Sequence, residues 1–449
     1  MHADLSRVTF RPDRHYSRVL AQQGRVQLDA DLNEQNQIQD HRLRTLVSDL
    51  IGPDGGPRHD AGFAITPVPG PPADLTIGEG RYYVDGFPID ATRAVPGVAV
   101  PDEGDPAEPE DPEPWSYRTQ PDGFRDELPG AFPYLAYLQV WERSVTAAED
   151  PALREVALGP AMPDTAARVR VVWQVRALTE AELGLAGTGE PAAIRAALAD
   201  WAGRDDEPSM AARARRPDRA DDEPGLIEPG ARYRGPENQL YRVEIHDGGT
   251  AARATLKWSR ENGSVVFGVD AIDGTWVDLA TLGADEKLQL GVGDWVEAVD
   301  TASAGPSPLL QVEEVDLYAS RVRLSAEPGP HSYLRRWESG AVTLKAGRWL
   351  PLEDGVEVYF RAGDFTYATG DYWLIPARTV TGDVEWPRDA EQRPMLIEPA
   401  GPAVSYAPLA WVTGPGEATD LRLIFDPLAP QPVEAAAPKR KPRRKATEA

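Results

Sequence analysis

The chain contains 449 residues, of which 41% are hydrophobic, and it carries a formal net charge of −25. This length predicts two to four domains, and the apolar content is sufficient for real hydrophobic cores. The absence of cysteine excludes disulfides, thiolate catalysis and cysteine-ligated zinc. So acidic a body repels nucleic acid and anionic membranes, and neither is expected as a partner.

The composition also predicts the fold class. The 43 prolines and 40 glycines favour many turns over long helices, and tryptophan and tyrosine set among valine and threonine favour strands. We therefore expect a mainly β protein with a short helical amino-terminal module and several small barrel-like or sandwich-like β domains. The sequence has neither a signal-peptide core nor 18 consecutive apolar residues, so we expect synthesis in the cytoplasm and no membrane insertion.

Residues 1–57 are predicted to form an arm followed by a helix. Asp29 can cap a helix that runs roughly over residues 30–51, and the sequence GPDGGP at 52–57 stops it. In the second half of this helix, a spacing of three and four residues produces an apolar stripe of Leu43, Leu46, Val47 and Leu50.

The arm and the first half of the helix are rich in amides, which provide no buried apolar face. Such a helix can pack against other backbones or other copies of itself through hydrogen bonds. The alternative is a solvated helix with one apolar end. We take the module as a docking and oligomerisation surface, and its candidate interface residues are Tyr16, Gln22, Gln23, Arg25, Gln27, Asn33, Gln35, Asn36 and Gln39.

The next segments alternate between β structure and charged stretches. Residues 58–100 are predicted to be a β-hairpin region, with Asp85-Gly86 as its turn. Residues 101–130 are predicted to be an acidic, proline-rich linker or loop. Residues 131–235 form a β region with a helical and charged insertion at 179–230, in which the helix spans about 179–201 and residues 203–230 are an exposed loop.

The carboxyl-terminal half is predicted to be β structure that ends in a tail. In residues 236–345, short alternating strands and the turn dipeptides Asp247-Gly248 and Asn262-Gly263 predict a barrel or sandwich. Residues 346–429 add further strands. Residues 430–449 are a disordered basic tail, which we interpret as a solubilising terminus or an electrostatic tether in preference to a nucleic-acid-binding patch.

Motifs that carry chemistry are scarce. The six histidines form no tight metal-binding spacing, and His246, beside Asp247, is better explained as the end of a strand than as a metal or acid–base site. Residues 29–33 imitate the start of a calcium loop, but Glu34 and Asp40 occupy the positions that need glycine and glutamate. We find no nucleophile elbow and no P-loop, and we predict no catalytic residue, metal or cofactor.

Two alternatives stay open at this level. With 72 acidic residues, a pair of carboxylates acting on a sugar cannot be singled out from the sequence. The tryptophans are expected to pack in cores, because most sit in strand patterns beside valine or leucine, although they also have the chemistry of a sugar-stacking platform.

Several blocks of the chain resemble a bacterial family of unknown function that is associated with phage-tail-like contractile injection systems. The blocks include HYSRVLAQQGRVQLDADLNEQ at 15–35, TIGEGRYYVDG at 76–86, ATLKWSRENGSVVF at 254–267 and GDYWLIPARTVTGDVEWP at 370–387. The amino terminus is also similar to that of some phage tail and baseplate proteins. The resemblance brings no established catalytic residues with it.

The resemblance implies a structural or accessory component of an injection particle, near the baseplate or a tail fibre. Its expected partners are other tail and baseplate proteins and further copies of itself, and release from the cell would be by lysis. The alternatives are a cargo or effector protein such as a polysaccharide-acting hydrolase, and a carbohydrate-binding surface protein with exposed rows of tryptophan or tyrosine.

Overall fold

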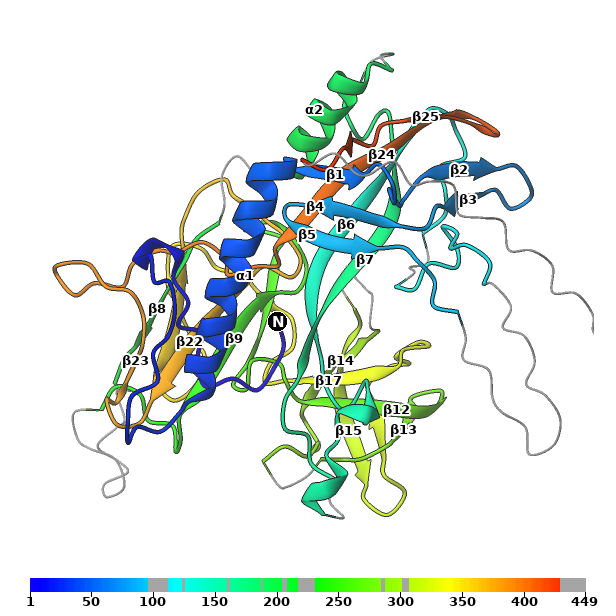
Figure 1. Ribbon diagram of the computed structural model, residues 1–449. Helices are drawn as coiled ribbons and strands as arrows, with labels where there is room; N and C mark the ends of the chain where they lie inside the picture. The colour runs from blue at the N-terminus through cyan, green and yellow to red at the C-terminus, as the bar shows by residue number, and fades with distance from the viewer. Residues whose placement is uncertain are drawn as a thin grey trace, which may run out of the picture.

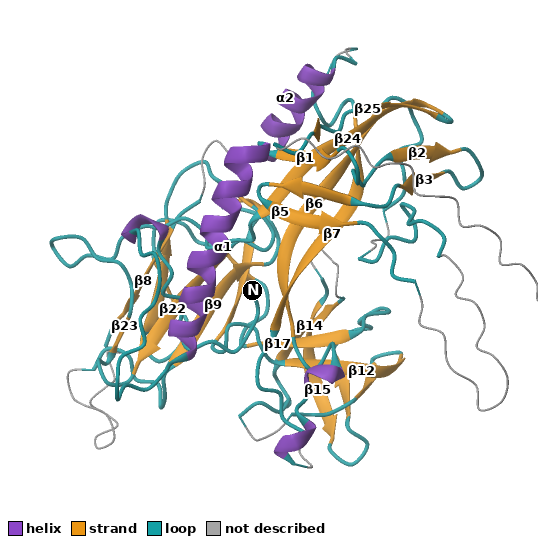
Figure 2. Ribbon diagram, in the orientation of Figure 1, coloured by secondary structure: helices purple, strands orange, loops and turns teal. Residues whose placement is uncertain are grey.

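The computed structural model describes residues 1–95, 112–122, 126–159, 162–185, 187, 189–203, 208–216, 231–283, 287–300 and 307–428. The protein is mainly β, as predicted (Figure 2). The described residues contain two α-helices, α1 (Asp29–Ile51) and α2 (Pro191–Ala202), and three short 3-10 turns at Pro12–Arg14, Pro151–Leu153 and Val156–Leu158. The stretch 96–111, with much of the predicted acidic linker, and the predicted tail at 430–449 lie outside the described residues.

The first β-rich body contains two four-stranded sheets and a two-stranded ribbon. Its strands are β1 (Asp54–Pro57), β2 (Ile65–Val68), β3 (Asp74–Ile77), β4 (Arg81–Val84), β5 (Phe87–Asp90), β6 (Tyr134–Val145), β7 (Arg168–Thr179), β24 (Val404–Gly414), β25 (Glu417–Asp420) and β26 (Ile424–Phe425). The sheet orders are β25-β24-β6-β7 and β26-β1-β4-β5, and β2 pairs with β3. One hydrophobic core, which includes Phe63, Tyr82 and Leu409, joins the three sheets.

The predicted hairpin at Asp85-Gly86 is confirmed. Val84 pairs with Phe87 across it, and both turn residues have positive φ, 47° and 79°. This is the turn that the right-handed twist of the flanking strands prefers, and the Asp-Gly sequence adopts it readily.

The second body is a sandwich of a five-stranded and a three-stranded sheet. Its strands are β8 (Met210–Ala214), β9 (Gln239–Ile245), β10 (Gly249–Thr250), β11 (Thr255–Ser259), β18 (Val342–Thr343), β19 (Trp349–Pro351), β20 (Val356–Phe360), β21 (Thr366–Tyr367), β22 (Tyr372–Arg378) and β23 (Asp383–Val384). The orders are β18-β11-β9-β22-β23 and β19-β20-β8, with a ribbon of β10 and β21. Tyr241, Phe360 and Trp373 lie in the core between the sheets.

The third body is a closed barrel within residues 236–345, where the sequence predicts a barrel or sandwich. Its strands are β12 (Val266–Asp273), β13 (Trp276–Leu279), β14 (Trp295–Val299), β15 (Leu309–Asp316), β16 (Arg321–Leu324) and β17 (Tyr333–Trp337). The order around the barrel is β12-β13-β16-β15-β14-β17. Closure leaves no free sheet edge, and alternate side chains such as Val277, Val296 and Leu334 fill the interior.

Figure 1 shows how the three bodies are arranged. Helix α1, in blue, crosses the front of the molecule beside the first and second bodies, and the barrel lies below them in this view. The long strand β6 of the first body pairs with β24 over the register Tyr134↔Val412 to Trp141↔Val404. Segments that lie far apart in the sequence therefore share a single sheet.

Two predictions for residues 179–230 are wrong. The helix begins at Pro191 and not at Thr179, because Thr179 is still paired with Tyr134 and positive-φ glycines at 184 and 187 interrupt the following turn. The segment read as an exposed loop contains the buried strand β8. Its alanines have low strand propensity, but they fit closely against β20, so tertiary packing overrides the local preference.

Half of the tryptophans are buried, and these agree with the predicted core packing. Six of the twelve are buried, namely Trp173, Trp258, Trp337, Trp373, Trp386 and Trp411. Trp201 is more exposed, and it packs edge-on against Tyr137 and Tyr406.

Candidate functional site

The amino-terminal arm runs beside helix α1 and is hydrogen-bonded to it. The hydroxyl of Thr9 donates to the Glu34 carboxylate at 2.6 Å, and the backbone N–H of Val19 donates to Oε1 of Gln35 at 2.7 Å. The rings of Phe10 and His41 lie 5.7 Å apart. The arm is therefore attached to one flank of the helix, and it remains exposed at almost every residue from 11 to 28.

Asp29 does not cap α1, in contrast to the prediction. The N-cap is Leu28, in an extended conformation, and Asp29 is the first helical residue. Its carboxylate accepts hydrogen bonds from the backbone N–H and the hydroxyl of Ser6, at 2.9 and 2.6 Å. Partial burial opposes ionisation of Asp29, but the Ser6 hydrogen bonds outweigh it and lower the pKa of this carboxyl. Asp29 therefore fastens the start of the arm to the start of the helix.

Helix α1 lies along the body and is anchored there on one face. Ala30 and Ile38 are buried. The guanidinium of Arg44 contacts the Glu142 carboxylate of β6 at 2.6 Å and lies 3.8 Å above the ring of Phe87. The hairpin turn approaches the helix so closely that a Cβ on Gly86 would lie 2.5 Å from the carbonyl oxygen of Arg44.

The opposite face of α1 points outward and carries its leucines. Leu32, Leu43, Leu46 and Leu50 are 65%, 57%, 54% and 61% exposed. Of the stripe predicted in the second half of the helix, Leu43, Leu46 and Leu50 thus face solvent and Val47 is half-buried. Leu32, in the first turn, is exposed on the same face. The body does not cover it, because Ala30 and Ile38 provide the buried face instead.

The nine candidate interface residues are distributed along this arm and helix. Tyr16, Gln22, Gln23, Arg25 and Gln27 are exposed on the arm, and Asn36 and Gln39 are exposed on the outward face of α1. Asn33 and Gln35 are half-buried on its flanks, where Gln35 bonds to the arm. The structure therefore brings these residues onto one side of the molecule. We name the exposed arm residues 11–28 and the outward face of α1 the assembly surface.

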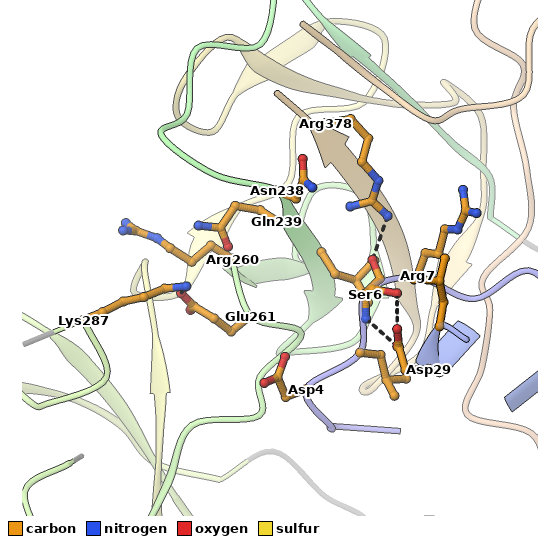
Figure 3. Close-up of a pocket in the computed structure, with 13 residues that line it drawn as sticks. Asp4, Ser6, Arg7, Asp29, Asn238, Gln239, Arg260, Glu261, Lys287 and Arg378 are labelled. Atoms are coloured by element: carbon orange, nitrogen blue, oxygen red, sulfur yellow. Dashed lines mark hydrogen bonds and ion pairs between the residues drawn. The ribbon is translucent and has the colours of Figure 1, made fainter. Parts of the chain in front are cut away.

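A pocket of about 520 Å³ opens at the base of the arm (Figure 3). It is lined by Asp4, Leu5, Ser6, Arg7, Leu28, Asp29, Asn238, Gln239, Leu240, Arg260, Glu261, Lys287 and Arg378. The sequence does not predict this pocket, because its residues come from six separate stretches of the chain and no short motif connects them.

The basic groups of the pocket are engaged with partners in the chain. Arg378 donates to the backbone oxygen of Ser6 at 2.7 Å, as Figure 3 shows. Arg260 contacts Glu353 at 2.8 Å, and Arg7 contacts Glu385 at 3.1 Å. Pairing of this kind holds the arm to the second body, and it neutralises the cations that an anionic ligand would need.

A buried ionic network connects the second body to the barrel. Nζ of Lys257 in β11 lies 3.2 Å from Glu244 in β9 and 2.5 Å from Glu297 in β14. Trp337 donates its indole N–H to Glu297 at 3.0 Å. Burial opposes ionisation of Glu244, but Arg242 and Lys257 outweigh it and keep the pKa of this carboxyl well below its usual range.

His246 lies at the end of a strand, as the sequence predicts. Strand β9 ends at Ile245, and His246 follows it, buried, with Nδ1 4.0 Å from Glu297. Burial lowers its pKa, so the ring is neutral near neutral pH. Over the described parts of the chain, we find no group of three or more His, Asp or Glu side chains placed to hold a metal ion.

A second buried carboxylate pair adjoins the pocket. Nη2 of Arg336 lies 3.4 Å from Glu261 and 3.8 Å from Glu338, and the backbone N–H of Arg260 donates to Glu338 at 3.0 Å. Burial, with the nearby charge of Glu261, raises the pKa of Glu338 to about 7. These four residues form a second set of ionic contacts between the sandwich and the end of barrel strand β17.

Neither described helix is both long and apolar enough to span a membrane. No curated protein and no solved structure matches the chain significantly. A family profile, described as a family of unknown function (DUF6519), matches residues 1–186 and 186–418, which is most of the chain. The chain therefore belongs to this family of unknown function, DUF6519.

Proposed function

We propose that the chain is a structural component of a larger protein assembly, to which it attaches through the assembly surface. The observation that carries this proposal is the outward row of leucines on α1, each more than half exposed. Exposed apolar side chains that cluster on one face, as Leu43, Leu46 and Leu50 do, usually mark an interaction site, because their exposure to water is unfavourable.

The remainder of the molecule has the character of a scaffold. Buried ion pairs connect the sandwich to the barrel, and Arg44 with Glu142 connects α1 to the first body. Breaking a buried pair leaves an uncompensated charge, so such contacts resist relative movement of the bodies. A rigid set of β bodies with the assembly surface on one side suits a structural component that holds its neighbours in fixed positions.

The assembly that we propose is a phage-tail-like contractile injection particle, with the chain near its baseplate or tail fibre. The support is the resemblance of blocks such as 15–35, which overlaps the assembly surface. Its partners would be neighbouring tail and baseplate proteins. The chain would be made in the cytoplasm and incorporated into the particle there.

The test compares particles purified from cells that express the natural chain or the variant Tyr16→Ser, Leu20→Ser, Val26→Ser. All three side chains are exposed on the arm, so the fold should be unaffected. We expect the variant to be at least tenfold depleted from particles by mass spectrometry. Tyr318→Ser, at an exposed barrel tip, is the matched control and should be retained. Equal incorporation of the arm variant would refute the proposal.

A second candidate is a polysaccharide-acting hydrolase, delivered as cargo or effector. It is favoured by Glu338, whose raised pKa of about 7 suits a general acid, beside Glu261, which lines the pocket. If the purified chain cleaves a polysaccharide and Glu261→Gln abolishes cleavage, this candidate replaces the structural one. The carbohydrate-binding alternative is disfavoured, because Trp201 alone among the tryptophans is more than a third exposed.

A further inference from the structure

The outward face of α1 has the spacing of a coiled-coil seam. Its six exposed positions alternate by four and three residues, in the order Leu32, Asn36, Gln39, Leu43, Leu46 and Leu50. This is the a and d pattern of three heptads, in which residues 36, 43 and 50 are a positions and residues 32, 39 and 46 are d positions. We propose that this seam packs in parallel and in register against α1 of a second copy of the chain.

The seam is available, since the body covers the other side of the helix. Ala30 and Ile38 are buried, whereas all six seam residues are exposed. At 1.5 Å per residue the helix is about 34 Å long, so the seam extends over nearly its full length. This inference rests on the proposed function, because it names the partner of one part of the assembly surface.

The order of residues in the seam favours a parallel pair. In register, each leucine meets its own equivalent, Asn36 meets Asn36 and Gln39 meets Gln39. Side-chain amides carry both donors and acceptors, so each amide layer can satisfy itself. An asparagine at an a position is a known determinant of register in parallel coiled coils.

Antiparallel pairings fit less well. Full overlap would place Leu32 on Leu50 but would also bury Asn36 against Leu46 and Gln39 against Leu43. A buried amide without a partner costs about 1–3 kcal/mol. The antiparallel register that pairs Asn36 with Gln39 leaves Leu46 and Leu50 outside the seam.

The seam alone buries too little surface for a stable pair, so we extend the interface onto the arm. From residue 32 to residue 50 the seam is about 27 Å long, and with a width of about 10 Å it offers roughly 270 Å² per copy, about a third of the ~800 Å² of a standard interface. The arm adjoins the seam at Gln35, and it carries Leu20 and Val26, which are 67% and 82% exposed. Helix and arm together supply the further apolar area that a stable pair needs.

The absence of cysteine from the chain allows a direct test. Leu32→Cys and Leu50→Cys are single variants at the two ends of the seam, and both positions are exposed. Thr45→Cys, also exposed but on the other side of the helix, is the matched control. Each full-length variant is oxidised at micromolar concentration, and covalent dimers are measured by non-reducing electrophoresis.

The parallel pair predicts that both leucine variants cross-link with themselves at least fivefold more than Thr45→Cys. In a fully overlapped antiparallel pair, two copies of residue 32 would be about 27 Å apart, because 18 residues separate positions 32 and 50. Cross-links found only in a mixture of the two variants, or no cross-links above the control, would overturn the inference.

The mass of the chain in solution provides a second, independent measurement. We expect light scattering to give twice the chain mass for the natural protein and the single-chain mass for Leu43→Glu, Leu46→Glu. Both leucines are exposed, so an unchanged circular dichroism melt should show that this variant still folds. A natural chain that is monomeric at about 50 µM would contradict the pairing.

Failure of this inference is distinguishable from failure of the proposed function. A monomeric chain that still enters particles through its arm would leave the attachment intact and remove the pairing. A chain that pairs through α1 and is never found in particles would leave the pairing intact and remove the proposed place in the assembly.

Discussion

At the junction of sandwich and barrel, Lys257 lies between two carboxylates. Its Nζ contacts Glu244 and Glu297, and its side chain is almost entirely buried. Neither carboxylate can return to water while the two bodies stay packed, so Lys257 provides a buried positive charge that both of them contact.

Removal of that charge should therefore be severe. We expect Lys257→Met to lower the free energy of unfolding by about 3–5 kcal/mol, since it removes the cation paired with the buried Glu297 and leaves Glu244 with Arg242. Chemical denaturation measures the change. Arg11→Met breaks the exposed ion pair with Asp13 and serves as the control, with an expected change below about 1 kcal/mol. Equal effects of the two variants would contradict a clamping role for Lys257.

The pH dependence of stability should report on Glu338. Its pKa rises from an ordinary 4.5 to about 7 on folding, so the folded chain binds the extra proton between these values. The contribution of Glu338 to the stability of the folded chain is fully present below about pH 4.5 and is lost as the pH rises through about 7. The Glu338→Gln variant should not show this loss of stability, because glutamine does not titrate.

Melting temperatures of the natural chain and Glu338→Gln, compared at pH 5 and pH 8, test this prediction. The melting temperature of Glu338→Gln, relative to that of the natural chain, should be a few degrees higher at pH 8 than at pH 5. Glu313→Gln, at an exposed position on β15, controls for the loss of one negative charge. A difference that stays constant with pH, or moves the other way, would show that Glu338 does not titrate as described.

At the scale of elements, the placement of α1 depends on the hairpin turn beneath it. Gly86 serves two purposes, because its φ of +79° forms the turn and its missing side chain admits the backbone of Arg44. A Cβ there would lie 2.5 Å from the carbonyl oxygen of Arg44 and 2.7 Å from its Cα. Backbone atoms cannot yield as a flexible side chain can, so the helix itself would have to move.

We accordingly expect Gly86→Ala to loosen α1 from the body. Gly24→Ala is the matched control, since Gly24 also has positive φ, +70°, but nothing lies within 4 Å of its Cβ position. The control should lose about 1–2 kcal/mol from backbone strain alone, and Gly86→Ala should lose more. Hydrogen exchange should show faster amide exchange in α1 only for Gly86→Ala; similar exchange in both variants would contradict the prediction.

At the scale of the whole molecule, the first residues of the chain lie where the bodies meet. The backbone of His2 exchanges hydrogen bonds with Ser144 of β6, and its ring lies 3.1 Å from Glu244 of β9. Asn262, in the turn that leads into the barrel, donates to the backbone oxygen of Ala3 at 2.8 Å. The arm is thus fixed at its origin and again at α1, which holds the assembly surface in one orientation.

The net charge of −25 should govern how two such molecules associate. Each copy repels the other over a distance that falls from about 30 Å at 0.01 M salt to about 10 Å at 0.1 M. We expect the dissociation constant of the α1 pair to fall at least threefold between these conditions. Sedimentation equilibrium measures it, and tighter pairing at low salt would show that attraction between charges dominates the contact.

The local features of this protein can be predicted from the sequence. The β class, a helix over about residues 30–51 and the hairpin at Asp85-Gly86 follow from composition, periodicity and turn chemistry, which act over a few neighbouring residues. The spacing of Leu43, Leu46 and Leu50 is likewise visible without coordinates. These features are encoded where they occur, so reading the chain in order suffices to find them.

The buried surfaces and the pairing of the strands depend on the tertiary structure. It placed Ala30 and Ile38 of α1 against the body and left the leucines outside, the reverse of what an apolar stripe suggests for an isolated helix. It also paired β6 with β24, and it built the pocket from six separate stretches. Which face of an element is buried depends on all the other surfaces against which it could pack. A short stretch of sequence does not contain those surfaces.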